Sequence, residues 1–306
     1  MELAETIKQF YFSRFSELPR DKQFHFASRL AAWQNDPQAI SELERLAAYM
    51  VPDKSDLKPL LQAILDSQPS RPYAYELRRP YFQKYPGLFG IHNAMFRVRH
   101  LKEFYGIDAR QQLIELAGRE VMERIYNGLR ADPDAIRLLS RFAVDYLFLY
   151  EILFEKPRQF DPRELTAIAD GYDSKDIVQS HLFIYLFTHA IIADSNFYAR
   201  AVPSDRIGLY QVMLHKLEAV LDDGRKFKLD NQFELLVAAR ICGIDSGLSD
   251  KINQAARQSL DTSGNFIVDS FNGPPNTYLN SFSGSEHRNV LYIMSTSPYK
   301  LSPSLK

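Results

Sequence analysis

Apolar residues recur at intervals of three and four along most of this chain, the spacing that places them on one face of an α-helix. The segment 108–129 is a clear example, with apolar positions at Leu113, Leu116, Ala117, Val121, Met122, Ile125 and Leu129. The same pattern predicts helices near residues 2–17, 20–34, 37–50, 55–67, 88–104, 108–129, 133–155, 162–170, 175–195, 204–222, 229–242, 248–260 and 285–295. We therefore predict an all-α fold.

Residues typical of the first and last turns of helices support this interpretation. Three Asp-Pro pairs, Asp36-Pro37, Asp132-Pro133 and Asp161-Pro162, each offer a carboxylate to unpaired amides and a proline at the first helical position, where no N–H is needed. Glycine tolerates the left-handed conformation that ends many helices. We expect helices to end near Gly106, Gly171, Gly224 and Gly243.

From about residue 88, long helices alternate with short turns at a repeat of about 45 residues, within the range of helical-repeat arrays. The segment 175–195 is apolar on nearly all sides and is expected inside, whereas the amphipathic 108–129 is expected outside. Alternating inner and outer helices predict a helical-hairpin solenoid or a closed α/α toroid.

Two segments interrupt the helical pattern. Residues 69–90 are rich in proline, tyrosine and arginine, and we interpret them as a connector between an N-terminal helical cap, residues 1–86, and a helical-repeat body, residues 87–306. Near the C-terminus, Gly264–Asp269 and Gly273–Leu279 contain glycine, proline and asparagine, which predicts a short β-hairpin before the last helix.

A helical-hairpin array followed by Gly264-Asn265-Phe266 resembles the α/α-toroid superfold, which includes glycan-active enzymes, terpene cyclase-like proteins and lanthionine-forming cyclases. The zinc cysteines of the lanthionine cyclases and the aspartate-rich motif of the terpene cyclases are absent, so the resemblance does not imply those activities. A second pattern, Thr188-His189 with Asp194–Tyr198 and later Asp230 with Glu234–Leu236, is similar to uncharacterised bacterial helical proteins.

Charge and composition exclude some classes of function. The 37 basic and 38 acidic residues nearly cancel, so no overall field favours nucleic acid or an anionic membrane. The apolar segments 146–154 and 182–193 are short or interrupted by polar residues, and we expect them to be core helices rather than membrane spans. A lone cysteine, Cys242, and no secretory signal at the N-terminus predict a cytoplasmic protein.

His189 is the first candidate for chemistry, because Thr188 and Asp194 bring polar atoms to an otherwise apolar helix. These neighbours are suited to orienting an imidazole for acid/base catalysis. His181 lies eight residues earlier, about 12 Å along the helix axis, so one metal ion cannot bind both histidines. The alternative for both is a structural role, with the ring bonded to a backbone carbonyl.

Glu234 lies in an apolar segment and is expected to be paired, with Arg240 or with a neighbouring helix, or to have a raised pKa. Asp230 lies one turn earlier on the same side. Two such carboxylates resemble the acid and base of a glycan-active toroid. The alternative is an N-cap aspartate with a structural ion pair.

The polar run Glu286, His287 and Arg288 begins the last predicted helix, whose free amides and positive dipole end favour an anionic group. His287 and Arg288 are the best partners for His189 if a toroid closes. Alternatively, Glu286 itself offsets the helix dipole.

No Walker loop, GxGxxG, HExxH, GxSxG or kinase motif is found. We predict a polar central cavity that binds a small molecule, glycan or peptide, with His189, Glu234 and His287 as catalytic residues if the protein is an enzyme. His181, Asp194, Asp230, Glu286 and Arg288 are the predicted ligand-binding residues. No metal ligand set is predicted and the cofactor is unknown. A non-catalytic scaffold that binds a protein or peptide is the alternative.

Overall fold

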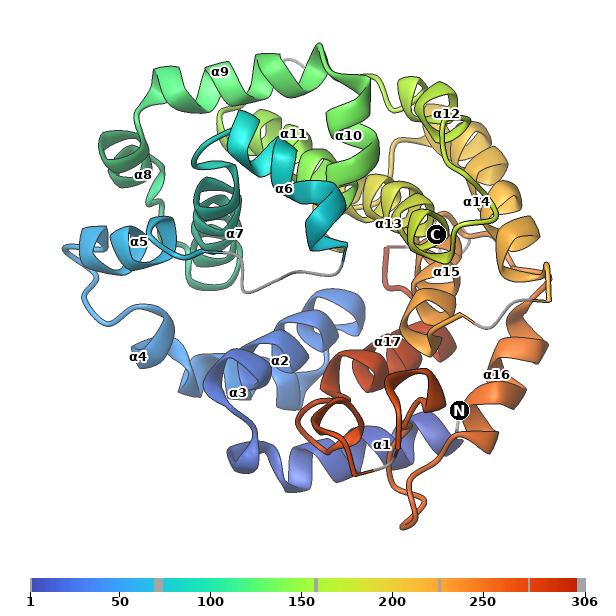
Figure 1. Ribbon diagram of the computed structural model, residues 1–306. Coiled ribbons are helices and arrows are strands. Elements are labelled where there is room, and N and C mark those ends of the chain that lie inside the picture. Colours follow the sequence, from blue (N-terminus) through green and yellow to red (C-terminus); the bar gives the residue numbers. More distant parts are fainter. Residues whose placement is uncertain (1, 69–73, 157–158, 225–226, 275, 302–306) are drawn as a thin grey trace. The chain divides into compact units, whose positions relative to one another are not determined.

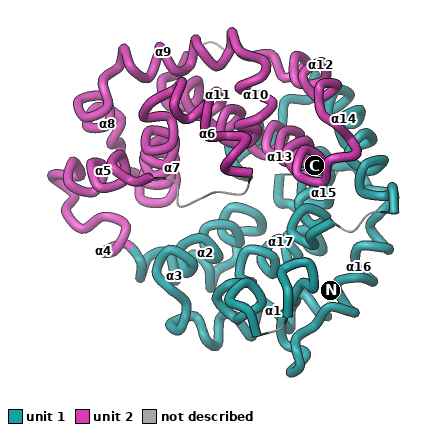
Figure 2. Tube along the Cα trace, in the orientation of Figure 1, with its two compact units in different colours: residues 1–46, 195–306 teal, residues 47–194 magenta. Residues whose placement is uncertain are grey.

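The computed structural model describes residues 2–68, 74–156, 159–224, 227–274 and 276–301 (Figure 1). Over this part of the chain the fold is all-α, as predicted, and contains no β-strand. The elements fall into two compact units, residues 1–46 with 195–306 (unit 1) and residues 47–194 (unit 2) (Figure 2). This division differs from the boundary at residue 86, which stays a prediction.

Unit 1 is organised around its last helix. Helix α17 packs against α15, α2 and α1, and α15 also packs against α14 and α16. The run Val290–Met294 of α17 is buried and forms part of the core. The elements of unit 1 are α1 (Glu2–Ser13), η1 (Phe15–Glu17), α2 (Arg20–Gln34), α3 (Pro37–Arg45), η2 (Ser204–Arg206), α14 (Ile207–Leu221), α15 (Leu229–Ile241), α16 (Ser249–Gln258), η3 (Ser270–Asn272), η4 (Tyr278–Asn280) and α17 (Glu286–Thr296).

Unit 2 is organised around α11, which packs against both α7 and α13. Its elements are α4 (Ala47–Met50), α5 (Lys58–Leu65), α6 (Tyr75–Lys84), α7 (Leu88–Tyr105), α8 (Arg110–Ala117), α9 (Arg119–Arg130), α10 (Pro133–Leu139), α11 (Arg141–Leu153), α12 (Glu164–Ala169) and α13 (Ile177–Asp194). By length and composition α13 alone among the described helices passes a test for a membrane span, but 72% of it is buried within the protein. A buried core helix passes the same test, and α13 fits that description.

Most of the predicted helix ends are found. Asp36 and Asp132 accept hydrogen bonds from the amides of Ala39 (3.0 Å) and Ala135 (3.1 Å), which caps α3 and α10. Asp161 instead accepts from the Arg163 amide, and α12 begins two residues later than predicted, at Glu164. Gly106, Gly224 and Gly243 have positive φ angles, whereas Gly171 does not.

The two longest predicted helices are each broken into two. The segment 108–129 divides into α8 and α9 at Gly118, whose φ of +79° is left-handed. The segment 133–155 divides into α10 and α11 at Ser140, with φ +54°. A positive φ angle raises the conformational energy of a residue such as serine, which has a Cβ atom. Its buried hydroxyl donates to the carbonyl of Leu182 at 2.7 Å, so a contact distant in sequence holds this break.

The predicted connector at residues 69–90 was partly wrong. Residues 69–73 lie outside the described part of the chain, but Tyr75–Lys84 forms α6, with Pro80 inside the helix. Arg78 explains why a helix forms there: it is buried, donates to the carbonyl of Leu138 at 3.2 Å and lies over the ring of Phe142. The stabilisation from these contacts to α10 and α11 outweighs the cost of Pro80, which removes one hydrogen bond from the helix.

The predicted β-hairpin was also wrong. The chain reverses between Leu260 and Ile267, but only a single antiparallel bridge forms there. Asp261 accepts hydrogen bonds from the amides of Asn265 and Phe266, so side-chain bonds satisfy backbone groups that a longer ladder would otherwise pair.

Candidate functional site

A buried aspartate joins two histidines in unit 2. Asp145 on α11 lies with Oδ1 3.0 Å and Oδ2 3.1 Å from Nδ1 of His189 on α13. Its Oδ2 also lies 3.6 Å from Nε2 of His92 on α7. The His189 cluster (His92, Asp145 and His189) therefore links the three helices that pack together at the centre of this unit.

The carboxylate determines how His189 carries its proton. An ionised carboxylate only accepts hydrogen bonds, so the Nδ1 atom that faces Asp145 must carry a hydrogen. A neutral imidazole has one N–H, which leaves a lone pair on Nε2 of His189. Within the described chain this ring is hydrogen-bonded to Asp145, and 14% of the side chain is exposed. In this tautomer, Nε2 of His189 is a hydrogen-bond acceptor.

Electrostatics support this pairing. Burial by itself would raise the pKa of Asp145, whose side chain is only 3% exposed. The charge of protonated His189 and its hydrogen bond, followed by the nearby ring of His92, outweigh burial and lower the pKa of Asp145 to about 2. The carboxylate therefore stays ionised at all ordinary pH values.

This lowered pKa predicts a loss of stability in acid. The pKa falls from the ordinary 3.8 to about 2 on folding, so Asp145 contributes stability that is present above pH 4 and is lost as the pH falls from about 4 to 2. The contribution is about 2 kcal/mol. We expect urea unfolding of the wild type between pH 5 and 2 to show it, and Asp145→Asn to lack it. Identical pH dependence of the two proteins would contradict the pairing.

A second group of charged side chains lies between α2 and α17 in unit 1. The Glu286 cluster consists of Lys22, His25 and Arg29 on α2 with Glu286 and His287 on α17. Glu286 is completely buried, with Oε1 2.7 Å from Nδ1 of His25 and Oε2 3.5 Å from Nζ of Lys22. The rings of His25 and His287 lie 5.2 Å apart between centroids.

Burial opposes the nearby positive charges in setting the pKa of Glu286 but acts in the same sense as they do at His25. Burial raises the pKa of Glu286, against the smaller effects of Lys22, His287 and Arg29. Burial also lowers the pKa of His25 well below its usual 6.5, and the charges of Arg29, His287 and Lys22 lower it further. His25 is therefore neutral at pH 7, and its Nδ1 atom is hydrogen-bonded to Oε1 of Glu286.

The other predicted site residues also have defined positions. Glu234 on α15 is buried, with Oε1 3.7 Å from Nε2 of His287, so its partner is on a neighbouring helix. The Arg288 Nε atom lies 3.4 Å from Oδ2 of Asp230. The Arg240 guanidinium, the other predicted partner of Glu234, donates to the carbonyl of Ser295.

His181 and Asp194 are both buried in α13 of unit 2. His189 belongs to unit 2, whereas Glu234 and His287 belong to unit 1, so a joint catalytic site of these three stays a prediction.

Two of the central residues, Asp145 and His25, were not predicted from the sequence. Asp145 is the only charged residue in Phe142–Tyr150, an apolar segment of α11, and this is the same signal that singled out Glu234. His25 carries no such signal, because α2 is polar and apolar in similar measure. Only the packing of α2 on α17 brings it to Glu286.

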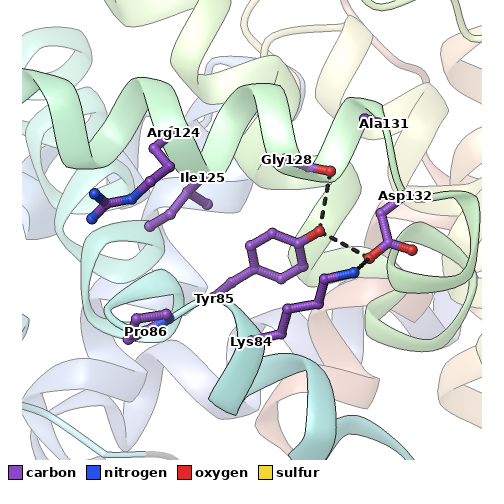
Figure 3. Close-up of a pocket in the computed structure, with 8 residues that line it drawn as sticks. All are labelled: Lys84, Tyr85, Pro86, Arg124, Ile125, Gly128, Ala131 and Asp132. Carbon is purple, nitrogen blue, oxygen red and sulfur yellow. Dashed lines mark hydrogen bonds and ion pairs between the residues drawn. The ribbon is translucent and has the colours of Figure 1, made fainter.

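A pocket of about 430 Å³ in unit 2 is a weaker candidate (Figure 3). The hydroxyl of Tyr85 lies 3.1 Å from the carbonyl oxygen of Gly128 and 2.9 Å from Oδ2 of Asp132, which also pairs with Lys84 at 2.6 Å. Burial, and then Asp132, raises the pKa of Tyr85 to about 12. These polar groups satisfy one another, which leaves Arg124 at the edge as the main group available to a ligand.

Comparison of the chain with protein-family models, with curated proteins and with solved structures gave no match. Over the described residues, no set of three or more histidine, cysteine, aspartate or glutamate side chains has an arrangement suited to a metal ion.

Proposed function

We propose that this helical protein binds a polar small molecule, glycan or peptide, and that His189 exchanges a proton with it. The observation that carries the proposal is the pairing of Nδ1 of His189 with buried Asp145 at 3.0 Å, which leaves Nε2 as a base. A carboxylate that fixes the tautomer of a histidine and stabilises its protonated form is the arrangement used by many general bases. His92, beside the same carboxylate, acts as a positioning residue.

The degree of burial favours a functional role. His189 holds one ring nitrogen on a carboxylate that is 3% exposed, while its own side chain is 14% exposed. Three helices each contribute one side chain, so the ring is held by rigid elements rather than by a loop. This preorganisation is what proton transfer to a bound molecule needs.

The test is thermal unfolding with panels of sugars, nucleotides, short peptides and divalent metals, for the wild type, His189→Gln and a control, His215→Gln, whose side chain is 88% exposed. A ligand at a hundred times its Kd stabilises the folded state by about 2.7 kcal/mol. We expect such a shift in the wild type and the control but a much smaller one in His189→Gln. If the ligand is also turned over, His189→Gln should lower kcat by about 10²- to 10⁴-fold.

Equal shifts in the wild type and in His189→Gln would exclude His189 from the site. No shift with any compound would favour the alternative, an interaction scaffold. One observation supports that alternative: Tyr278 and Leu279, adjacent in η4, are 64% and 50% exposed. Exposed large apolar side chains that are neighbours are typical of a surface that binds another protein.

A further inference from the structure

An arginine with an unsatisfied buried donor lies in the Glu286 cluster of unit 1. The Nε atom of Arg29 is buried and has no hydrogen-bond partner in the described chain. A buried donor that lacks a partner costs stability, and more so when it is charged. Such a group is therefore a candidate for satisfaction by a ligand.

The neighbours of Arg29 show what kind of ligand would fit. Lys22, His25 and Arg29 follow one another at intervals of three and four residues, so they share one face of α2. Glu286 holds His25 at 2.7 Å and Lys22 at 3.5 Å, and Glu234 lies 3.7 Å from His287. Each carboxylate is thus matched to an imidazole, and the guanidinium of Arg29 is the cation in this cluster without a carboxylate within ion-pair distance in the described chain.

We propose that this face of α2 is a binding site for a small oxyanion, a phosphate or a carboxylate, which accepts hydrogen bonds from Arg29 and is attracted by Lys22. Arginine suits such a ligand because its planar fork of N–H groups matches two oxygens at once. The site differs in all its residues from the His189 cluster and does not depend on the function proposed for that cluster.

The depressed pKa of His25 agrees with this assignment. Burial, and then the charges of Arg29, His287 and Lys22, disfavour protonation of the His25 ring. An oxyanion bound at Arg29 would offset part of that positive charge. Glu286 opposes the anion, but its own pKa is raised by burial and its oxygens already face His25 and Lys22.

The experiment is calorimetric titration of the full-length protein with inorganic phosphate and, separately, with succinate, which distinguishes the two sources of the oxyanion. We expect at least one to bind. Arg29→Gln should weaken its binding by about tenfold to a hundredfold, since a charge-assisted hydrogen bond is lost. Arg29→Lys should retain part of the affinity. The matched control is Arg45→Gln, which removes an exposed guanidinium of the same unit that pairs with Glu42.

A second variant and a spectroscopic measurement guard against misfolding. Lys22→Gln alters a side chain that is 26% exposed, so it should fold, and it should weaken binding severalfold. Addition of the anion should also move the ring-proton NMR signals of His25. The proposal is overturned if neither anion binds the wild type at millimolar concentration, or if Arg29→Gln and Lys22→Gln both bind within twofold of it.

Discussion

Replacement of Asp145 with alanine is expected to lower the free energy of unfolding by about 3 kcal/mol, among the largest effects of any single side chain in unit 2. Asp145 is 2% exposed and is the acceptor for His189, and it also faces His92. Its removal leaves the Nδ1 atom of His189 without its acceptor and takes away the carboxylate 3.6 Å from Nε2 of His92, a buried atom with no hydrogen-bond partner in the described chain. A buried donor that loses its partner costs about 1–3 kcal/mol, and more when the lost partner is charged.

Urea unfolding at pH 7 measures this change. The matched control is Asp134→Ala, which removes an aspartate of the same unit that is 67% exposed and pairs with Arg137. We expect the control to change stability by less than about 0.5 kcal/mol, because exposed ion pairs contribute little. A loss below about 1 kcal/mol for Asp145→Ala would show that the pairing does not offset the cost of burying the carboxylate.

The helical fold could be predicted from the sequence because its signals are local. The three- and four-residue spacing and the Asp-Pro pairs depend on neighbours along the chain, and most helices occur where these signals place them. The errors arise where distant contacts decide. Ser140 breaks a helix because its hydroxyl bonds to Leu182, and α6 forms despite Pro80 because Arg78 is buried against Leu138 and Phe142.

The candidate site could likewise be predicted only where its signal is local in the sequence. His189 could be selected from its own segment, since Thr188 and Asp194 are polar residues on an apolar helix. Its partner could not, because Asp145 lies 44 positions earlier on another helix and only the packing of α11 against α13 joins them. His25 and Glu286 are 261 positions apart. Sequence spacing describes one helix at a time, whereas both clusters are formed between helices.

The two clusters share one chemical arrangement. In each, a histidine with its Nδ1 on a buried carboxylate comes from a helix that packs against the carboxylate's own helix. The environments differ: His189 lies beside a carboxylate of very low pKa, while His25 lies among cations and stays neutral. The first arrangement suits a base that becomes protonated, and the second suits a neutral ring near a bound anion.

The other large effect on stability is expected where two helices of unit 2 pack closely. Gly90 on α7 lies so close to α5 that a Cβ atom there would be 2.2 Å from the carbonyl oxygen of Leu65 and 2.9 Å from its carbon. These are backbone atoms, so a change of side-chain rotamer cannot relieve the clash. We expect Gly90→Ala to lower the free energy of unfolding by about 3 kcal/mol, although alanine is the better helix former.

Gly208→Ala is the matched control, because Gly208 is also helical, in α14, and a Cβ atom there meets nothing within 4 Å. That variant should be more stable than the wild type by about 0.5–1 kcal/mol, since alanine loses less backbone entropy on folding. Urea unfolding of both variants therefore distinguishes the effect of packing from that of helix propensity, because the two substitutions should change the free energy of unfolding in opposite directions. If Gly90→Ala were neutral or stabilising, α5 and α7 could not be packed as closely as described, and the position of α7, which carries His92 to Asp145, would have to be revised.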